Sequence, residues 1–103
     1  MGDASWVIDT SRRDLIDEFR RAPIGRHSPD LRLLLNRMRM SEGANAYILV
    51  CTRPHQEWRL ARKSTRRGGA VTLVAGHIFH TPEEAEWAVF KLRWQELTGE
   101  GLT

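Results

Sequence analysis

A chain of 103 residues is long enough to bury one hydrophobic core, and its 41% apolar and 28% charged residues are ordinary for a single globular domain. It contains no apolar run near the roughly 18 residues that a membrane-spanning helix needs, so we expect no membrane partner. The net charge of +3 is a mild excess that permits contact with nucleic acid without requiring it.

The first predicted element is a short helix that follows a loose lead-in. We expect residues 1–10 to form this lead-in and residues 11–103 to form one α+β domain. Ser11 and Asp14 have the spacing of a capping box, which predicts a helix over residues 12–21. Its apolar face comprises Leu15, Ile16 and Phe19. The apolar residues of the lead-in, which could dock on the domain, are Trp6, Val7 and Ile8.

A second helix is predicted from Pro29 to about Met40. Ser28 can cap its first turn, Pro29 suits the first helical position, and Asp30 suits the positive end of the helix dipole. The core-facing stripe of this helix comprises Leu31, Leu34, Leu35 and Met38.

Three strands are expected next, at residues 46–52, 57–63 and 71–75. The first is apolar on both faces, which indicates a central strand or one that is covered on both sides. The second alternates, with Trp58 and Leu60 on one face and basic residues on the other. Gly76 is expected to bulge or break the third strand before Ile78 and Phe79. Short links between the strands favour an antiparallel meander.

The last predicted helix is the best delimited element of the chain. Thr81 and Glu84 form a capping box, Pro82 suits the first helical position, and Gly99 is a natural stop. At 100° per residue this helix has two opposite apolar faces. The small-residue face comprises Ala85, Ala88, Val89 and Leu92, and the aromatic stripe comprises Trp87, Phe90, Trp94 and Leu97. We expect the small-residue face to pack on the sheet, because small side chains allow close approach.

The aromatic stripe then needs a cover of its own. Three exposed aromatic side chains would present roughly 450–750 Å² of apolar surface, more than a monomer usually leaves in water. Two covers are open at this point. The two N-terminal helices could bury the stripe, or a protein partner could bind Trp87, Phe90, Trp94 and Leu97 as an interface.

Metal and thiol chemistry have little support in the sequence. His77 and His80 are three residues apart, and residues at this spacing on a strand point to opposite faces, so we expect structural or surface histidines. Cys51 lies in the most apolar strand and is expected to act as a small buried hydrophobe rather than a nucleophile. A lone cysteine and a first segment without the pattern of a secretory signal favour a cytoplasmic location. We assign no catalytic, cofactor-binding or metal-binding residue to this chain.

Basic residues gather around the second strand and the turn that follows it. Such residues on the open face of a three-stranded sheet can sit in a nucleic-acid groove, which makes a nucleic-acid-binding module the alternative function. The simpler interpretation is a solvated edge whose charges discourage strand pairing. The candidate contacts are Arg59, Arg62, Lys63, Arg66 and Arg67.

Five segments stand in a distinctive order and spacing. They are Arg26–Leu31 (RHSPDL), Asn36–Met40 (NRMRM), Tyr47–Val50 (YILV), Trp58 with Ala61, and Phe79–Phe90 (FHTPEEAEWAVF). Together they resemble the small (alpha) subunit of bacterial N,N-dimethylformamidase and its short stand-alone relatives. The likeness extends from about Gly25 to Leu97.

This resemblance implies a non-catalytic accessory subunit. In that enzyme the large subunit carries the mononuclear iron that hydrolyses the amide, and the small subunit packs on it. No iron ligand transfers to this chain, so the resemblance implies a protein partner and no cofactor here. The expected fold is α+β: two N-terminal helices, a three-stranded antiparallel meander and a long C-terminal helix packed on the sheet.

Overall fold

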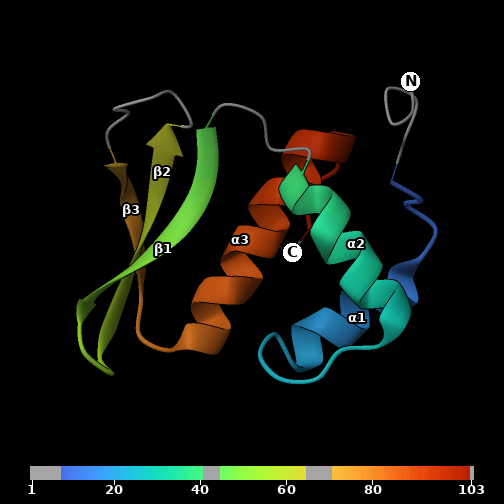
Figure 1. The fold of residues 1–103 in the computed structure, drawn as a ribbon, viewed down its shortest axis with the longest axis horizontal. Coiled ribbons are helices and arrows are strands. Elements are labelled where there is room, and N and C mark those ends of the chain that lie inside the picture. Colours follow the sequence, from blue (N-terminus) through green and yellow to red (C-terminus); the bar gives the residue numbers. More distant parts are fainter. Residues whose placement is uncertain (1–7, 41–44, 65–70, 103) are drawn as a thin grey trace.

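The computed structural model describes residues 8–40, 45–64 and 71–102, and it has the predicted α+β order (Figure 1). Two N-terminal helices precede a three-stranded antiparallel sheet, and a long helix closes the fold. The elements are α1 (Arg13–Arg21), α2 (Pro29–Met40), β1 (Asn45–Arg53), β2 (Glu57–Ser64), β3 (Val71–Phe79) and α3 (Pro82–Thr98). No helix among the described residues is long and apolar enough to cross a membrane.

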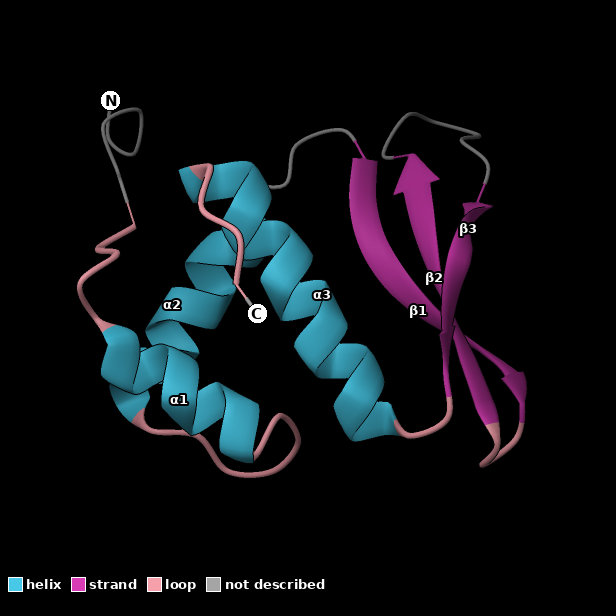
Figure 2. Cartoon of the chain, turned by 180° about the vertical axis from the view of Figure 1, so that it is seen from behind, coloured by secondary structure: helices cyan, strands magenta, loops and turns pink. Residues whose placement is uncertain are grey.

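α3 lies in the middle of a three-layer arrangement, between the sheet and the α1–α2 pair (Figures 1 and 2). Its two apolar faces therefore belong to two separate cores, and the small-residue face packs on the sheet as predicted. The small-residue face meets the sheet in a core whose buried members are Tyr47, Leu60, Phe79, Ala85 and Val89. The aromatic stripe meets the N-terminal helices in a second core, whose buried members are Ile8, Leu15, Ile16, Phe19, Leu31, Leu34, Met38, Phe90 and Trp94.

The ends of α3 follow the predicted signals closely. The Thr81 hydroxyl accepts a hydrogen bond from the Glu84 N–H at 3.1 Å, and Pro82 is the first helical residue. The Glu84 carboxylate accepts from the His80 N–H, one residue before the one a regular capping box would use. Gly99 ends the helix in the left-handed conformation, with φ of 79°, which a glycine adopts at little cost.

The predicted capping box of α1 does not form. The Ser11 hydroxyl donates to the Asp9 carboxylate at 2.5 Å instead, and the helix begins one residue later than expected, with Arg12 at the N-cap position. Arg12 binds Asp14 and Asp30 through its guanidinium group. Ser11 forms the local turn with Asp9 rather than the cap, because the Asp9 carboxylate is a charged acceptor only two residues away.

The N-cap of α2 is completed by a residue from α1. The Ser28 hydroxyl accepts from the Leu31 N–H at 3.2 Å, as predicted. Glu18 accepts both the Ser28 N–H at 2.7 Å and the Ser28 hydroxyl at 2.6 Å. These hydrogen bonds lower the pKa of the Glu18 carboxyl below its usual value. Glu18 of α1 thus accepts the N-cap N–H of α2, the hydrogen bond that a glutamate of the same helix accepts in a capping box.

The sheet has the order β1-β2-β3, so β1 is an edge strand and β2 is central. The interpretation of residues 46–52 as a central strand is therefore wrong. In a meander, the second strand of the sequence lies between the first and the third, so β1 lies at the edge. The register between β2 and β3 shifts between Arg59 and Ala61, and Gly76 has a φ of 83° in the irregular part of β3. This agrees with the bulge predicted at Gly76.

Candidate protein-binding surfaces

Two members of the aromatic stripe are buried within the chain. Trp94 is 0% exposed and Phe90 is 2% exposed, and both pack against the N-terminal helices. Phe90 stacks on Phe19 of α1 with ring centroids 4.6 Å apart. The indole N–H of Trp94 donates to Glu100 at 2.9 Å, so its polar atom is also satisfied inside the chain. Neither ring is presented to a partner in this arrangement.

The other two members of the stripe remain partly exposed. Trp87 and Leu97 pack at the margin of the helical core. The guanidinium of Arg20 and the ammonium of Lys91 each lie 5.7 Å from the Trp87 ring centroid, so two cations flank this ring. Trp87 and Leu97 are thus the part of the predicted interface that a partner could reach.

One face of the sheet carries apolar side chains that lie outside both cores of the described residues. Figure 2 shows that this face points away from all three helices. Of its large side chains, Val71 is 51% exposed, Leu73 is 49% exposed and Ile78 is 46% exposed. We call it the outer sheet face, and it comprises Ile48 and Val50 of β1, Ala61 of β2, and Val71, Leu73 and Ile78 of β3.

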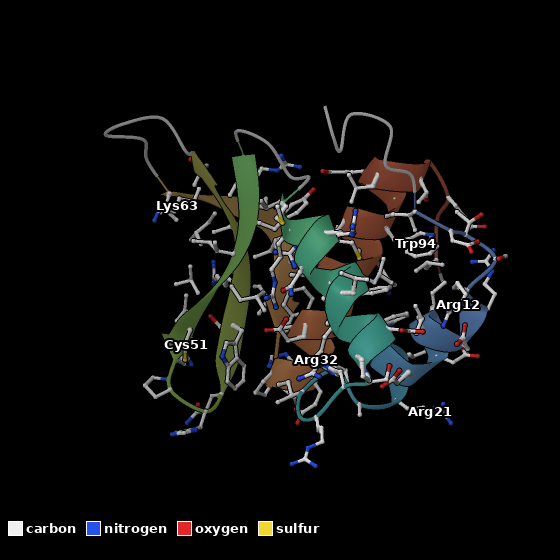
Figure 3. The ribbon with its side chains drawn as sticks, turned by 45° about the vertical axis from the view of Figure 1, so that its right-hand side comes forward. Arg12, Arg21, Arg32, Cys51, Lys63 and Trp94 are labelled. Carbon is white, nitrogen blue, oxygen red and sulfur yellow. The ribbon has the colours of Figure 1, made fainter. Side chains whose placement is uncertain are left out.

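Two cations lie on β2 within the outer sheet face. The register places Arg59 between Val50 and Ile78, and it pairs Lys63 with Val71. The Nε–H of Arg59 donates to the Glu57 carboxylate at 3.2 Å. Hydrogen bonds from Thr52 and Arg59 hold the pKa of the Glu57 carboxyl below its usual value. Figure 3 shows Lys63 on the side of the sheet away from the helices.

The predicted nucleic-acid contacts do not share one face. Arg59 and Lys63 lie on the outer sheet face, whereas Arg62 lies on the face toward α3. There the Arg62 guanidinium donates to Glu96 at 2.7 Å. Arg66 and Arg67 lie outside the described residues. The described part of the basic set is therefore divided between two sides of the sheet.

Tyr47, Arg62 and Glu96 form a polar cluster that joins the sheet to α3. The Tyr47 hydroxyl donates to Glu96, and the Arg62 guanidinium lies 4.3 Å from the Tyr47 ring centroid. Burial raises the pKa of the Tyr47 phenol, and the neighbouring Glu96 carboxylate raises it further. A catalytic tyrosine base needs the opposite shift, so the cluster is suited to holding the layers together.

A shallow groove runs beside α3, between α2 and the edge of β1. It consists of two adjoining hollows of about 200 and 290 Å³, which share Arg39, Glu86 and Arg93. The Arg93 guanidinium donates to the Tyr47 backbone carbonyl at 3.3 Å, so it occupies part of the β1 edge. Each hollow is smaller than a common small-molecule site.

The remaining candidate side chains are dispersed. Cys51 is exposed, so the prediction of a buried cysteine is wrong. The reason is that β1 curves away from α3 as it approaches the β1–β2 turn, and α3 no longer covers it there (Figures 1 and 3). Among the described residues, no group of three or more His, Cys, Asp or Glu could hold a metal ion. Of the two histidines considered from the sequence, His77 is half-buried and His80 is exposed.

Comparison with known families identifies the chain. Residues 7–102 match the family model of the N,N-dimethylformamidase alpha subunit. The chain belongs to this alpha-subunit family. The match covers nearly the whole sequence, including the helix α1 and the C-terminal tail that lie outside the resemblance noted from residue 25 to residue 97. A search of curated proteins found no match to this chain.

Sequence reasoning did not single out the outer sheet face. Its signal was present in β1, where Ile48 and Val50 alternate with apolar residues that face α3. An edge strand of a meander with one covered face should be polar on its other face. The conflict between the apolar pattern of β1 and its place at the edge is what marks this surface.

Proposed function

We propose that the chain is a non-catalytic accessory subunit that binds a larger catalytic subunit of a dimethylformamidase-type amide hydrolase. The single observation that supports this most strongly is the family match over residues 7–102. A subunit family implies a protein partner. In this proposal the iron belongs to the large subunit, and no step of the amide hydrolysis is assigned to residues of this chain.

One feature of the described residues agrees with a binding role. The outer sheet face leaves Val71, Leu73 and Ile78 about half exposed, which is common where proteins associate.

Co-expression with the iron-containing large subunit of the same organism tests the proposal. We expect the two chains to elute together in size exclusion chromatography, and the amide hydrolase activity to reside in the complex and never in this chain alone. Separate elution at micromolar concentrations would overturn the proposal. Salt-sensitive binding of the isolated chain to DNA or RNA, weakened by Arg59→Ala and Lys63→Ala, would favour the nucleic-acid alternative instead.

A further inference from the structure

The two layers that pack on α3 do not share a core. Among the described residues, none belongs both to the cluster between α3 and the sheet and to the cluster between α3 and the N-terminal helices. Figure 1 shows the α1–α2 pair on one side of α3 and the sheet on the other. Opening of one layer therefore leaves the core of the other intact. We call α1, α2 and the turn between them, residues 13–40, the helical lid.

The chain itself holds the sheet closer to α3 than it holds the helical lid. β3 ends at Phe79 and α3 begins at Pro82, so only two residues join the sheet to this helix. The whole sheet lies between the lid and α3 along the sequence. Contacts between such distant segments have to offset a larger loss of chain entropy than contacts across a short link. The lid is therefore the layer that the chain restrains less.

Two carboxylates at the C-terminal end of α3 hold the two layers through separate hydrogen bonds. Glu96 accepts from the Arg62 guanidinium of β2 at 2.7 Å and from the Tyr47 hydroxyl of β1. Glu100, just after the helix, accepts from the Arg13 guanidinium of α1 at 2.8 and 2.5 Å. One carboxylate thus binds the sheet, and the other binds the helical lid.

The carboxylate that binds the lid is positioned by α3 and its C-terminal end. Glu100 accepts the Trp94 indole N–H at 2.9 Å, and its backbone N–H donates to the Thr98 hydroxyl at 3.1 Å. The Thr98 hydroxyl in turn donates to the Trp94 carbonyl at 2.7 Å. These three hydrogen bonds lie within residues 94–100, so they do not depend on the lid. Glu100 is therefore preorganised to receive the guanidinium of Arg13.

We propose that the helical lid opens as one unit while the sheet stays packed on α3, and that the Arg13–Glu100 ion pair is the latch that holds it closed. The lid moves as a unit because Glu18 of α1 binds the Ser28 cap of α2 and because both helices bury residues in the same core. Opening uncovers the aromatic stripe of α3 and leaves its small-residue face on the sheet. Segments that open below the free energy of global unfolding often coincide with such supersecondary units.

Amide hydrogen exchange of the full chain, measured by mass spectrometry, tests the inference without any partner. Arg13→Gln removes the latch and keeps the Trp94–Glu100 hydrogen bond, and it should accelerate exchange in residues 13–40 about two- to fivefold. Glu96→Ala is the matched variant on the sheet side. The contacts of Glu96 persist while only the lid is open, so this variant should accelerate exchange in β2 and leave exchange in residues 13–40 unchanged. Equal acceleration of both layers by Glu96→Ala would mean that the fold opens only as a whole, and would overturn the inference. Unchanged exchange of the lid in Arg13→Gln would overturn the role of the latch.

A measurement on the wild-type chain tests the opening even if a variant fails to fold. Amide exchange is followed at increasing urea concentrations below the unfolding transition. Opening of the lid exposes less surface than global unfolding, so the amides of residues 13–40 should show a smaller urea dependence than those of β2. A single urea dependence for the amides of both layers would overturn the inference.

Discussion

Trp94 joins the helical core to the C-terminal tail. Its ring is fully buried, and its indole N–H reaches the carboxylate of Glu100. We expect Trp94→Ala to lower the free energy of unfolding by about 3–5 kcal/mol, because it removes a large buried side chain and leaves a cavity. Trp94→Phe should cost less, since it keeps most of the ring. Chemical denaturation monitored by circular dichroism measures both. A loss below about 1 kcal/mol in Trp94→Ala would contradict the burial of this ring.

Glu100 should give the protein a measurable acid sensitivity. Two hydrogen bonds from Arg13, at 2.8 and 2.5 Å, and one from Trp94 lower the pKa of Glu100 from 4.5 to about 2. The lowered pKa means that this stabilisation is complete above pH 4.5 and is lost as the pH falls toward 2. Glu100→Gln should therefore flatten the fall in melting temperature across that range.

The matched control for Glu100 is Asp17→Asn on α1, because Asp17 is an exposed carboxylate outside the ion pairs of the described residues. It should keep the full acid dependence of the wild type. Equal slopes in Glu100→Gln and wild type between pH 4.5 and 2 would refute the role of Glu100. Other carboxyl groups with lowered pKa, such as Glu18 and Glu57, will preserve part of the slope in every variant.

At the scale of elements, α1 and α2 depend on each other through a shared cap. Ser28 caps α2, and Glu18 of α1 binds the Ser28 N–H and hydroxyl. Ser28→Ala should lower the free energy of unfolding by about 0.5–2 kcal/mol, the usual cost of losing an N-cap. In a double-mutant cycle with Glu18→Gln, the two effects should be less than additive, because they remove part of the same hydrogen-bonded unit. Strict additivity would mean that the two helices are capped independently.

The strands show where sequence information succeeds and where it stops. The alternation at Trp58 and Leu60 predicted the faces of β2 correctly, because a period of two is a local property. The apolar residues of β1 correctly predicted a strand. They do not show whether that strand is central or lies at the edge of the sheet with a second covered face. The exposure of Cys51 also depends on the curvature of β1 away from α3, which no local pattern encodes.

At the scale of the whole molecule, α3 determines the architecture, and its sequence predicted most of it. The residues from Thr81 to Gly99 predicted both caps of α3, its length and its two apolar faces. The sequence left open whether α1 and α2 or a partner would cover the aromatic stripe, because that choice depends on how distant segments meet. The long-range ion pair between Arg13 and Glu100, across nearly the whole chain, was invisible for the same reason. The outer sheet face needed the strand register before its rows could be seen.

The position of α3 between two cores has a consequence for how the protein is made. A ribosome delivers the chain from its N-terminus, so α1, α2 and all three strands emerge before the helix that both layers require. Until residues 82–98 have left the exit tunnel, Phe19 and Leu31 on one side and Tyr47 and Leu60 on the other lack the α3 side chains that complete their cores. Short helices have little stability of their own, and the apolar face of this small sheet is covered by α3. The native packing of both layers therefore forms only once α3 has emerged.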